Sequence, residues 1–296
     1  LIGVLTGQYG NYGLPPGKSS FFTHALVARH YLNGGSYPSG GSHRIAETIL
    51  STLQANGGEI KLKSTVQNIL VDNGKVTGVK LESGEVINSK KVISSVGAHN
   101  TYLRLLEPNH INSKLRSSIE NTRYSTGYFS LNLAIRNNQA SDSRPHPNLW
   151  IYPSYDHDYN QQQYFENQSN PLPISYVSFA STKDSGWKQK FPNSESINIL
   201  GSSSMKWFEK WKDTKSRKQE SEYQDLKSSI AERYLDTLFS YYPKLKSRVI
   251  SHETSSPITM KKYCNYQHGE TYGLEPSPHR FEQQWLRAQS PIKGLY

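Results

Sequence analysis

The sequence predicts an α/β protein of mixed α+β class, in which two domains are interleaved along the chain. Three observations support this prediction. The hydrophobic period changes from helical to alternating directly after Gly57-Gly58. Three short alternating segments then follow one another, with tight turns between them. A further alternating segment at residues 128–136 precedes more strands and one long helical segment, which is typical of an antiparallel sheet backed by a helix.

Two helices are predicted before the change of period. The first begins at Ser19 or Ser20 and ends before a glycine pair. Its apolar residues cover more than one helical stripe, so we expect it to be well buried. The second begins near Ser42, repeats apolar residues every four positions and ends at Gly57-Gly58.

A mostly parallel sheet is predicted for the region that follows. The near-continuous apolar run at residues 90–98 is typical of a strand that is covered on both faces, and residues 60–62 predict a second such strand. Between them we expect three short strands: residues 66–71, 76–81 and 86–87. The first turn, Asn73-Gly74, is a strong hairpin signal, because both central residues of a type I′ turn need φ > 0.

The second domain is predicted from residue 123 onward, after two short helices. Phe129, Leu131 and Leu133 alternate along its first strand, and residues 173–182 and 196–204 predict further strands. A long helix follows, with apolar residues on one face from Tyr223 onward.

Composition excludes several classes of protein. The chain has 296 residues and a formal net charge of +10, and its densest basic stretch, residues 206–218, also contains Glu209 and Asp213. This stretch is typical of a solvated surface, so we expect no nucleic-acid partner. No apolar run reaches the roughly 20 residues that span a bilayer. A single cysteine and the lack of a signal peptide predict a cytoplasmic or peripheral membrane protein that is not secreted.

Four stretches carry a family resemblance: "YGLPPGKSSFFTHALVARHYLNGG", "YPSGGSHRIAETI", "NGGEIKLKSTVQNILVDNGKVTGVKLESGEVINSKKVISSVGAHNTYLRLLEP" and "GETYGLEPSPHRFEQQWLRAQSPIKGLY". They resemble the phytoene desaturase-type flavoproteins, in particular the branch of carotenoid isomerase and all-trans-retinol 13,14-reductase (retinol saturase). The resemblance implies a two-dinucleotide-binding-domain flavoprotein fold with bound FAD, NAD(P)H as a candidate electron donor, and a substrate domain built on the interleaved antiparallel sheet. It divides the chain into substrate-domain helices (1–37), FAD-binding domain (38–122), substrate domain (123–262) and a return to the FAD-binding domain (263–296).

The resemblance also implies a function. We expect an FAD-dependent oxidoreductase that reduces, desaturates or isomerises C=C bonds of a lipophilic polyene of retinol or carotenoid type, with peripheral membrane contact. The alternatives are an amine-oxidase-like flavoenzyme and a non-enzymatic module that binds lipophilic partners or anionic surfaces. The histidines show no metal-binding pattern, so no metal site is expected.

Site residues follow from the resemblance alone, and no catalytic side chain is assigned. On the cofactor side it implies the backbone of Val66 at the adenine and Ser95 and Gly97 near the phosphate and ribose, together with Gly58 and the Gly40-Gly41 turn. On the flavin and substrate side it implies Gly269, Tyr272 and Gly273. Plain turns are the alternative for these glycines. Phe129, Leu131 and Leu133 are candidates for a polyene tunnel, against ordinary core packing.

Two departures from the family matter. The G-x-G-x-x-G phosphate loop is absent, since "GQYGNYG" has the wrong spacing and no strand before it. The chain also ends at "KGLY", where the family continues into a strand and a glycine-rich helix start. We therefore expect an internal fragment that lacks the first βαβ unit and the last strand and helix. Such a fragment would bind FAD weakly or not at all and would be inactive by itself.

Overall fold

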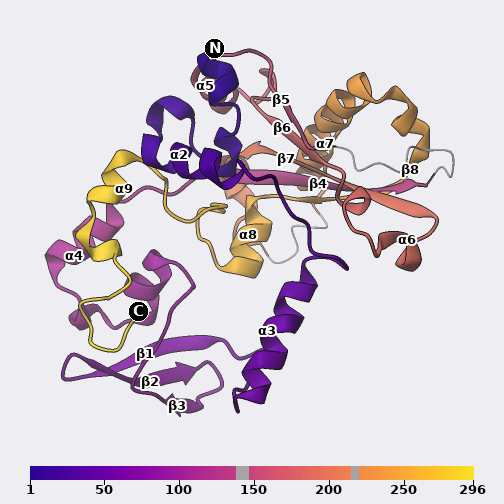
Figure 1. Cartoon of the computed structure of the whole chain (residues 1–296). Coiled ribbons are helices and arrows are strands. Elements are labelled where there is room, and N and C mark those ends of the chain that lie inside the picture. The colour runs from indigo at the N-terminus through magenta and orange to yellow at the C-terminus, as the bar shows by residue number, and fades with distance from the viewer. Residues whose placement is uncertain (138–146, 215–219) are drawn as a thin grey trace.

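The computed structural model describes residues 1–137, 147–214 and 220–296. Its strands form two antiparallel sheets, one with three strands and one with five. The helices α4 (Ser113–Glu120), α8 (Pro257–Cys264) and α9 (Pro278–Glu282) lie between the two sheets (Figure 1). This arrangement confirms the predicted mixed α/β class and its antiparallel second sheet.

The three-stranded sheet is the predicted meander. It consists of β1 (Val66–Asp72), β2 (Lys75–Leu81) and β3 (Val86–Asn88), in the order β1-β2-β3. The turn between β1 and β2 has φ +47° at Asn73 and +72° at Gly74, as a type I′ turn requires. The Asn73-Gly74 turn therefore forms as predicted and pairs β1 with β2.

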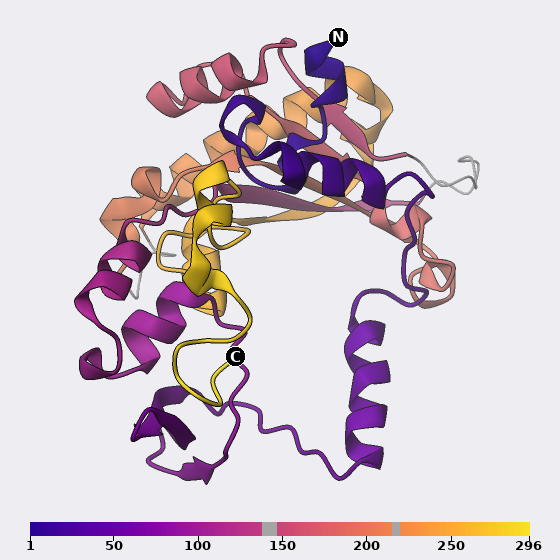
Figure 2. The ribbon, with the colours of Figure 1, turned by 60° about the vertical axis from the view of Figure 1, so that its left-hand side comes forward.

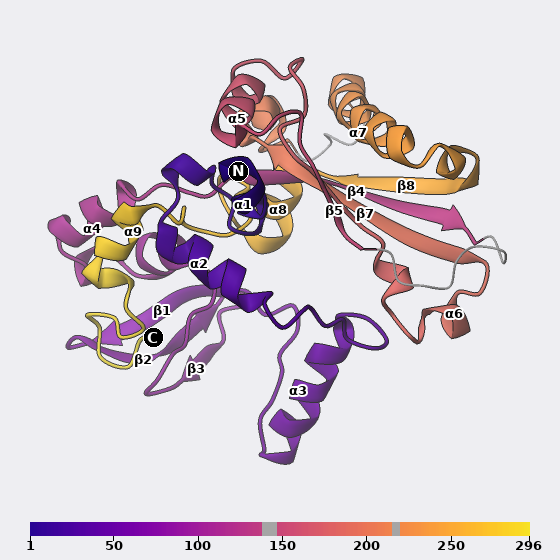
Figure 3. The ribbon, with the colours of Figure 1, turned by 45° about the horizontal axis from the view of Figure 1, so that its top comes forward.

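The five-stranded sheet contains β4 (Gly127–Arg136), β5 (Leu149–Ile151), β6 (Ser175–Ser178), β7 (Ser194–Ser203) and β8 (Val249–Ser255), in the order β5-β6-β7-β4-β8. The long helix α7 (Ser221–Tyr241) lies on one face of it (Figure 3). The helix buries Tyr223, Ile230, Tyr234 and Leu238, which confirms the apolar face read from the sequence. These side chains and those of β4 form the largest buried cluster of the described residues.

The remaining helices are short or lie at the surface: α1 (Ile2–Leu5), α2 (Phe21–His30), α3 (His43–Ala55), α5 (His157–Glu166) and α6 (Trp187–Lys190), with a π-helical turn η3 at Asn100–Leu105. None of the helices within the described ranges is both long enough and apolar enough to cross a membrane.

The burial predicted for α2 is wrong. The helix begins as predicted at Ser20, whose hydroxyl accepts the N–H of Phe22 at 3.2 Å. The Phe21 side chain, however, is 80 % exposed, and Leu26 and Leu32 are exposed as well. Helical spacing shows only that one surface of the helix is apolar, whereas burial needs a partner surface. The described residues cover one side of α2, so the apolar residues on its other side stay exposed.

Helix α3 has its predicted ends and an uncovered apolar face. The N–H groups of Gly57 and Gly58 donate to the carbonyls of Gln54 and Leu53 at 3.0 and 2.9 Å, which closes the helix in a Schellman motif. The helix stands apart from both sheets (Figure 2), and its Ile45 is 56 % exposed. The glycine pair therefore acts as a helix cap.

The mostly parallel sheet predicted around the meander is not formed. Residues 60–62 and 90–98 contain no regular strand, and Leu62 and Ile93 are 82 % and 83 % exposed. Only residues 92–94 of the second segment are paired: a parallel bridge joins Val92 to Leu295, and the N–H of Ser94 donates to the carbonyl of Tyr296 at 2.8 Å. A buried parallel strand needs partners on both edges, and the described residues supply one edge of residues 92–94.

The segment before α3 is joined to the five-stranded sheet by polar contacts. Gly40 donates its N–H to Asp184 Oδ1 at 2.7 Å, and the hydroxyls of Ser39 and Ser185 lie 2.7 Å apart. At the start of the chain, His157 Nε2 donates to the carbonyl of Gly3 at 2.7 Å. The domain boundaries at 37/38, 122/123 and 262/263 stay predictions.

Candidate functional site

A small pocket of about 50 Å³ forms where three distant segments meet: residues 96–100, Tyr124 and residues 266–274. Antiparallel bridges hold the third segment against the start of β4, since Tyr124 pairs with Leu274 and Gly127 pairs with Glu270. The side-chain amide of Asn100 donates to the carbonyls of Val96 and Asn265, at 2.9 and 3.1 Å, and so ties the first segment to the third.

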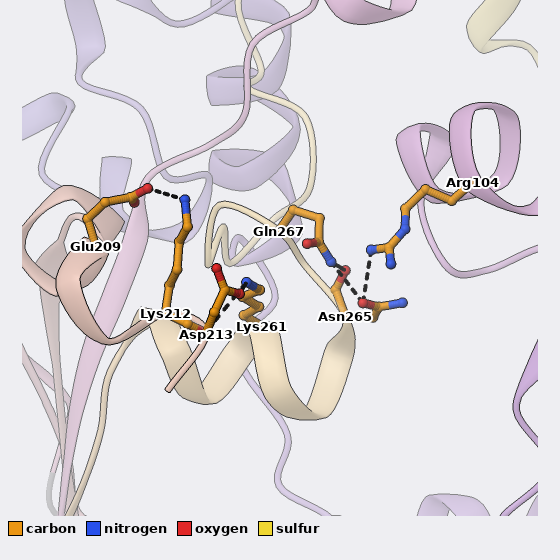
Figure 4. Close-up of polar contacts among 7 residues, drawn as sticks. All are labelled: Arg104, Glu209, Lys212, Asp213, Lys261, Asn265 and Gln267. Atoms are coloured by element: carbon orange, nitrogen blue, oxygen red, sulfur yellow. Dashed lines mark hydrogen bonds and ion pairs between the residues drawn. The ribbon is translucent and has the colours of Figure 1, made fainter. Parts of the chain in front are cut away.

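The third segment is also anchored by polar side chains around the end of α8 (Figure 4). Arg104 Nη1 donates to Asn265 Oδ1 at 3.1 Å, and Gln267 Nε2 donates to the same oxygen at 2.8 Å. Asn265 itself has a left-handed backbone, φ +57°, which ends the helix and turns the chain toward the pocket. On the other side of α8, Lys261 forms an ion pair with Asp213 at 2.6 Å.

Ion pairs also neutralise part of the basic stretch predicted to be a solvated surface. Lys212 pairs with Glu209, and Lys210 pairs with Glu222 from α7. Residues 215–219, at the end of this stretch, lie outside the described residues.

Two glycines predicted from different parts of the sequence line the same pocket. Gly97, predicted on the cofactor side, has φ +90°, and Gly273, predicted on the flavin and substrate side, has φ +69°. A Cβ at Gly97 would meet only the Tyr266 ring, at 3.6 Å, and one at Gly273 would meet nothing within 4 Å. Ser95 is exposed two residues before Gly97. The pocket therefore has open main chain at the positions where the resemblance implies a ligand.

Other residues predicted for this region have structural roles. A Cβ at Gly269 would lie 2.4 Å from Pro257 Cβ, so close packing explains this glycine. Tyr272 points away from the pocket, and its hydroxyl donates to the carbonyl of Gly10 at 3.1 Å. Its ring meets the ring of Tyr128 edge-on, with the centroids 6.0 Å apart.

The remaining cofactor-side predictions are not brought to the pocket. The N–H of Gly40 is taken by Asp184, and that of Gly41 by the carbonyl of Pro38. Gly58 caps α3, and Val66 is a half-buried residue at the start of β1. None of these four residues lines the pocket.

The three tunnel candidates lie inside the core of the five-stranded sheet. Phe129 and Leu131 have no exposed surface, and Leu133 is almost completely buried. They pack with α7, and the Phe129 ring is parallel to the Tyr234 ring at a centroid distance of 6.1 Å. Ordinary core packing, the alternative considered for these residues, is what the structure shows.

Sequence reasoning missed an aromatic cluster at the pocket, in which the rings of His99 and Tyr124 form one wall. The Tyr124 ring contacts two imidazoles, with its centroid 4.4 Å from that of His99 and 3.9 Å from that of His268. Burial lowers the pKa of both histidines, which keeps both rings neutral near pH 7. Burial, followed by the charge of Glu270, raises the pKa of Tyr124 to about 12. This wall is therefore uncharged.

Glu270 is the second group that sequence reasoning missed. Its side chain is 4 % exposed and lines the pocket, and its carboxylate accepts the N–H of His268 at 3.0 Å. Burial raises the pKa of this carboxyl, although hydrogen bonds from its own N–H and that of His268 oppose the shift. The only signal in the sequence is its place inside "GETYGLE", because burial of one acid cannot be read from spacing.

The part of the chain that the structure describes contains no group of three His, Cys, Asp or Glu side chains that could hold a metal ion.

Comparisons with known proteins identify the family of the chain. The profile of a family described as "Flavin containing amine oxidoreductase" matches residues 8–214. The chain is 32 % identical to the human all-trans-retinol 13,14-reductase over 308 aligned positions, which cover 100 % of this chain and 50 % of that protein. It is 27 % identical over 253 positions to the chloroplastic prolycopene isomerase of Daucus carota, covering 85 % of this chain and 38 % of that protein.

One solved structure shows the same fold. An oxidoreductase from Methanosarcina mazei superposes with a TM-score of 0.52 at 14 % identity, over 88 % of this chain and 49 % of that one. The chain spans 50 % and 38 % of the lengths of the two curated relatives named above. These relatives represent the two branches, retinol reductase and carotenoid isomerase, that the sequence resembles, which confirms the resemblance.

Proposed function

The chain belongs to the flavin-containing amine oxidoreductase family, and on this premise we propose that it serves in an FAD-dependent oxidoreductase acting on a lipophilic polyene. The proposed reaction is the reduction, desaturation or isomerisation of a C=C bond in a retinol-type or carotenoid-type molecule. The similarity to a retinol reductase along the whole chain supports this substrate class.

One structural observation carries the proposal. Gly97 and Gly273 were assigned to the cofactor side and to the flavin and substrate side, and they line a single pocket. Residues far apart in a sequence are brought to one pocket when the fold builds a common site there.

The residues present fit part of an FAD molecule. The open turn at residues 95–97 allows a ribose to approach the main chain closely, whereas the buried Glu270 in the same pocket disfavours a phosphate there. The N–H groups of Gly40 and Gly58 are already used within the chain, so these two residues have no free main-chain N–H to offer a cofactor. When bound, a flavin supplies the electrons for double-bond chemistry, while the protein supplies binding, orientation and exclusion of water.

The residues of the pocket suit a flat and uncharged ligand. The neutral rings of His99 and Tyr124, which line the pocket, offer aromatic surface without a positive charge. Glu270 adds one hydrogen-bond acceptor to an otherwise uncharged lining. We propose that these groups orient the substrate end and exclude water from it. For a net reduction, NAD(P)H is the two-electron donor that we propose.

An amine is the second candidate substrate, because a buried carboxyl beside aromatic rings also suits an ammonium group. Titration of the purified chain with all-trans-retinol and with benzylamine, followed by protein fluorescence, separates the two. We expect saturable binding of retinol and none of benzylamine. The reverse result would refute the polyene proposal.

The flavin part of the proposal has its own test. We expect added FAD to bind weakly but saturably, with quenching of flavin fluorescence. Gly97→Val should abolish this binding, because a β-branched residue is strained at φ +90°. Gly35→Val is the control, since a Cβ there meets nothing within 4 Å and no positive φ is required. Equal FAD binding by both variants would remove Gly97 from the cofactor site.

Peripheral membrane contact is proposed from the low solubility of a polyene in water. The measurement is co-sedimentation of the chain with phosphatidylcholine vesicles, with and without phosphatidylserine. We expect binding to both, strengthened by the anionic lipid because the net charge is +10. A chain that stays in the supernatant with both vesicles contradicts the proposal.

A further inference from the structure

The pocket at residues 96–100, Tyr124 and 266–274 has acceptor groups and no basic side chain. Its lining includes Glu270, His99 and Asn100, but no lysine or arginine. A phosphate or carboxylate group would therefore meet a carboxyl without a compensating cation. The pocket is built for a ligand group that donates a hydrogen bond.

Glu270 has unused acceptor capacity. Among the described residues it forms no ion pair, and the N–H groups that it accepts come from the main chain of residues 268 and 270. A carboxylate offers about four lone-pair positions on its two oxygens. A buried acceptor without a hydrogen-bond partner costs free energy, so a hydrogen-bond donor on a ligand would stabilise this carboxyl.

His99 adds a second acceptor beside it. Its ring donates a hydrogen bond to the carbonyl of Ile119, whereas Nε2 is buried without a partner. A carbonyl can only accept, so the proton of the neutral ring is on Nδ1 and Nε2 is an acceptor. His99, Tyr124 and Glu270 all line the pocket, although His99 Nε2 itself is buried.

The size of the pocket limits the group that it can hold. Its enclosed space is about 50 Å³, and one water molecule needs roughly 10–15 Å³ of space measured in the same way. A hydroxymethyl group fits this space, whereas a polyene chain does not. The pocket therefore suits the polar end of a longer molecule, with Tyr124 available to donate to the oxygen of that group.

We propose that Glu270 is a specificity-determining residue that accepts a hydrogen bond from the terminal hydroxyl of a polyene alcohol, while Tyr124 donates to the same hydroxyl oxygen. The proposal rests on the proposed function and narrows its substrate class from polyenes in general to polyene alcohols. A hydrocarbon polyene would leave the buried carboxyl unpaired, and such an unpaired group penalises the wrong ligand.

The test compares two probes on the purified chain: all-trans-retinol and its methyl ether, which has the same polyene but no hydroxyl proton. Binding is followed by retinoid fluorescence. For the wild-type chain we expect retinol to bind at least about tenfold more tightly than the ether, as for a hydrogen bond to a charged group.

Glu270→Gln should reduce this preference to about threefold or less, because the amide has nearly the same shape and its oxygen still accepts a hydrogen bond, but it carries no charge. The ether should bind more tightly to Glu270→Gln than to the wild type, because no unpaired carboxylate is left buried beside it. Glu275→Gln is the matched control, since Glu275 lies in the same segment and does not line the pocket. Thermal unfolding of each variant verifies that it is folded.

Each outcome decides between the two proposals. A reduced retinol preference in Glu270→Gln, with no reduction in Glu275→Gln, supports the assignment. Equal binding of both probes to the wild type, or an undiminished preference in Glu270→Gln, overturns the assignment and leaves polyene binding intact. No binding of either probe to the wild-type chain overturns the assignment together with the proposed function.

Discussion

Replacing Leu131 by alanine tests whether the apolar residues of β4 form a core or a tunnel. Leu131 has no exposed surface and lies in β4, an interior strand of the sheet, opposite Ile199 of β7 and Thr254 of β8. Because β4 is hydrogen-bonded on both edges, its backbone cannot move inward to fill the space that the missing side chain leaves.

The magnitude follows from two contributions. Leucine to alanine removes three buried carbon atoms, at about 0.8 kcal/mol each, or about 2.4 kcal/mol. A residual cavity of roughly 50 Å³ adds about 1.2 kcal/mol, at about 24 cal/mol per Å³. We therefore expect Leu131→Ala to lower the free energy of unfolding by about 3 to 4 kcal/mol.

The assay is urea unfolding followed by tryptophan fluorescence, because Trp207 and Trp211 belong to or pack against the same cluster. Ile45→Ala on the exposed face of α3 is the control, with an expected change below about 0.5 kcal/mol. Retinol affinity of the folded Leu131→Ala chain should equal that of the wild type. The core assignment fails if the two variants are equally stable and Leu131→Ala loses retinol affinity.

Three further predictions concern individual groups. Burial raises the pKa of the Glu270 carboxyl above 4.5, so this carboxyl stays protonated to higher pH in the folded chain than in the unfolded chain. The free energy of unfolding therefore falls as the pH rises from 4.5 through the pKa of the folded chain. Glu270→Gln should therefore raise the melting temperature more at about pH 7 than at about pH 4; equal shifts at both would contradict the burial argument. Hydrogen bonds from the N–H groups of Gly40 and Gly186 lower the pKa of the Asp184 carboxyl below 3.8. These bonds therefore stabilise the folded chain above pH 3.8, and this stabilisation is lost as the pH falls below 3.8 and the carboxylate is protonated. Asp184→Asn should speed limited proteolysis at residues 31–42 at neutral pH, and an unchanged cleavage rate would show that this contact does not hold the segment. Gly74→Ala should lower the free energy of unfolding in urea by about 1 to 2 kcal/mol, since φ is +72° there and a Cβ meets no other atom within 4 Å. Gly35→Ala is the control, and an equally small loss in both variants would show that the positive φ at Gly74 does not strain an alanine.

Local features of the structure were determined by the sequence alone. The Asn73-Gly74 pair specifies the turn of the meander, because the required φ angles belong to those two residues. Ser20 and Gly57 mark the ends of α2 and α3 for the same reason, since caps act within one turn of the helix. Alternation along β4 likewise identifies the buried face of the second sheet, as a period of two allows only one inward set.

Tertiary structure decided which apolar surfaces are covered and which residues share a site. Ile93 and Phe21 belong to apolar patterns like that of Leu131, yet they are exposed, because burial depends on a partner surface that is distant in the sequence. The pocket likewise depends on strand pairing between Tyr124 and Leu274, and that pairing places Glu270 beside His99 and Tyr124. The sequence by itself determined the resemblance and the two glycines of the pocket. Only the fold decided which acid is buried there, because the desolvation of a carboxyl depends on every segment that surrounds it.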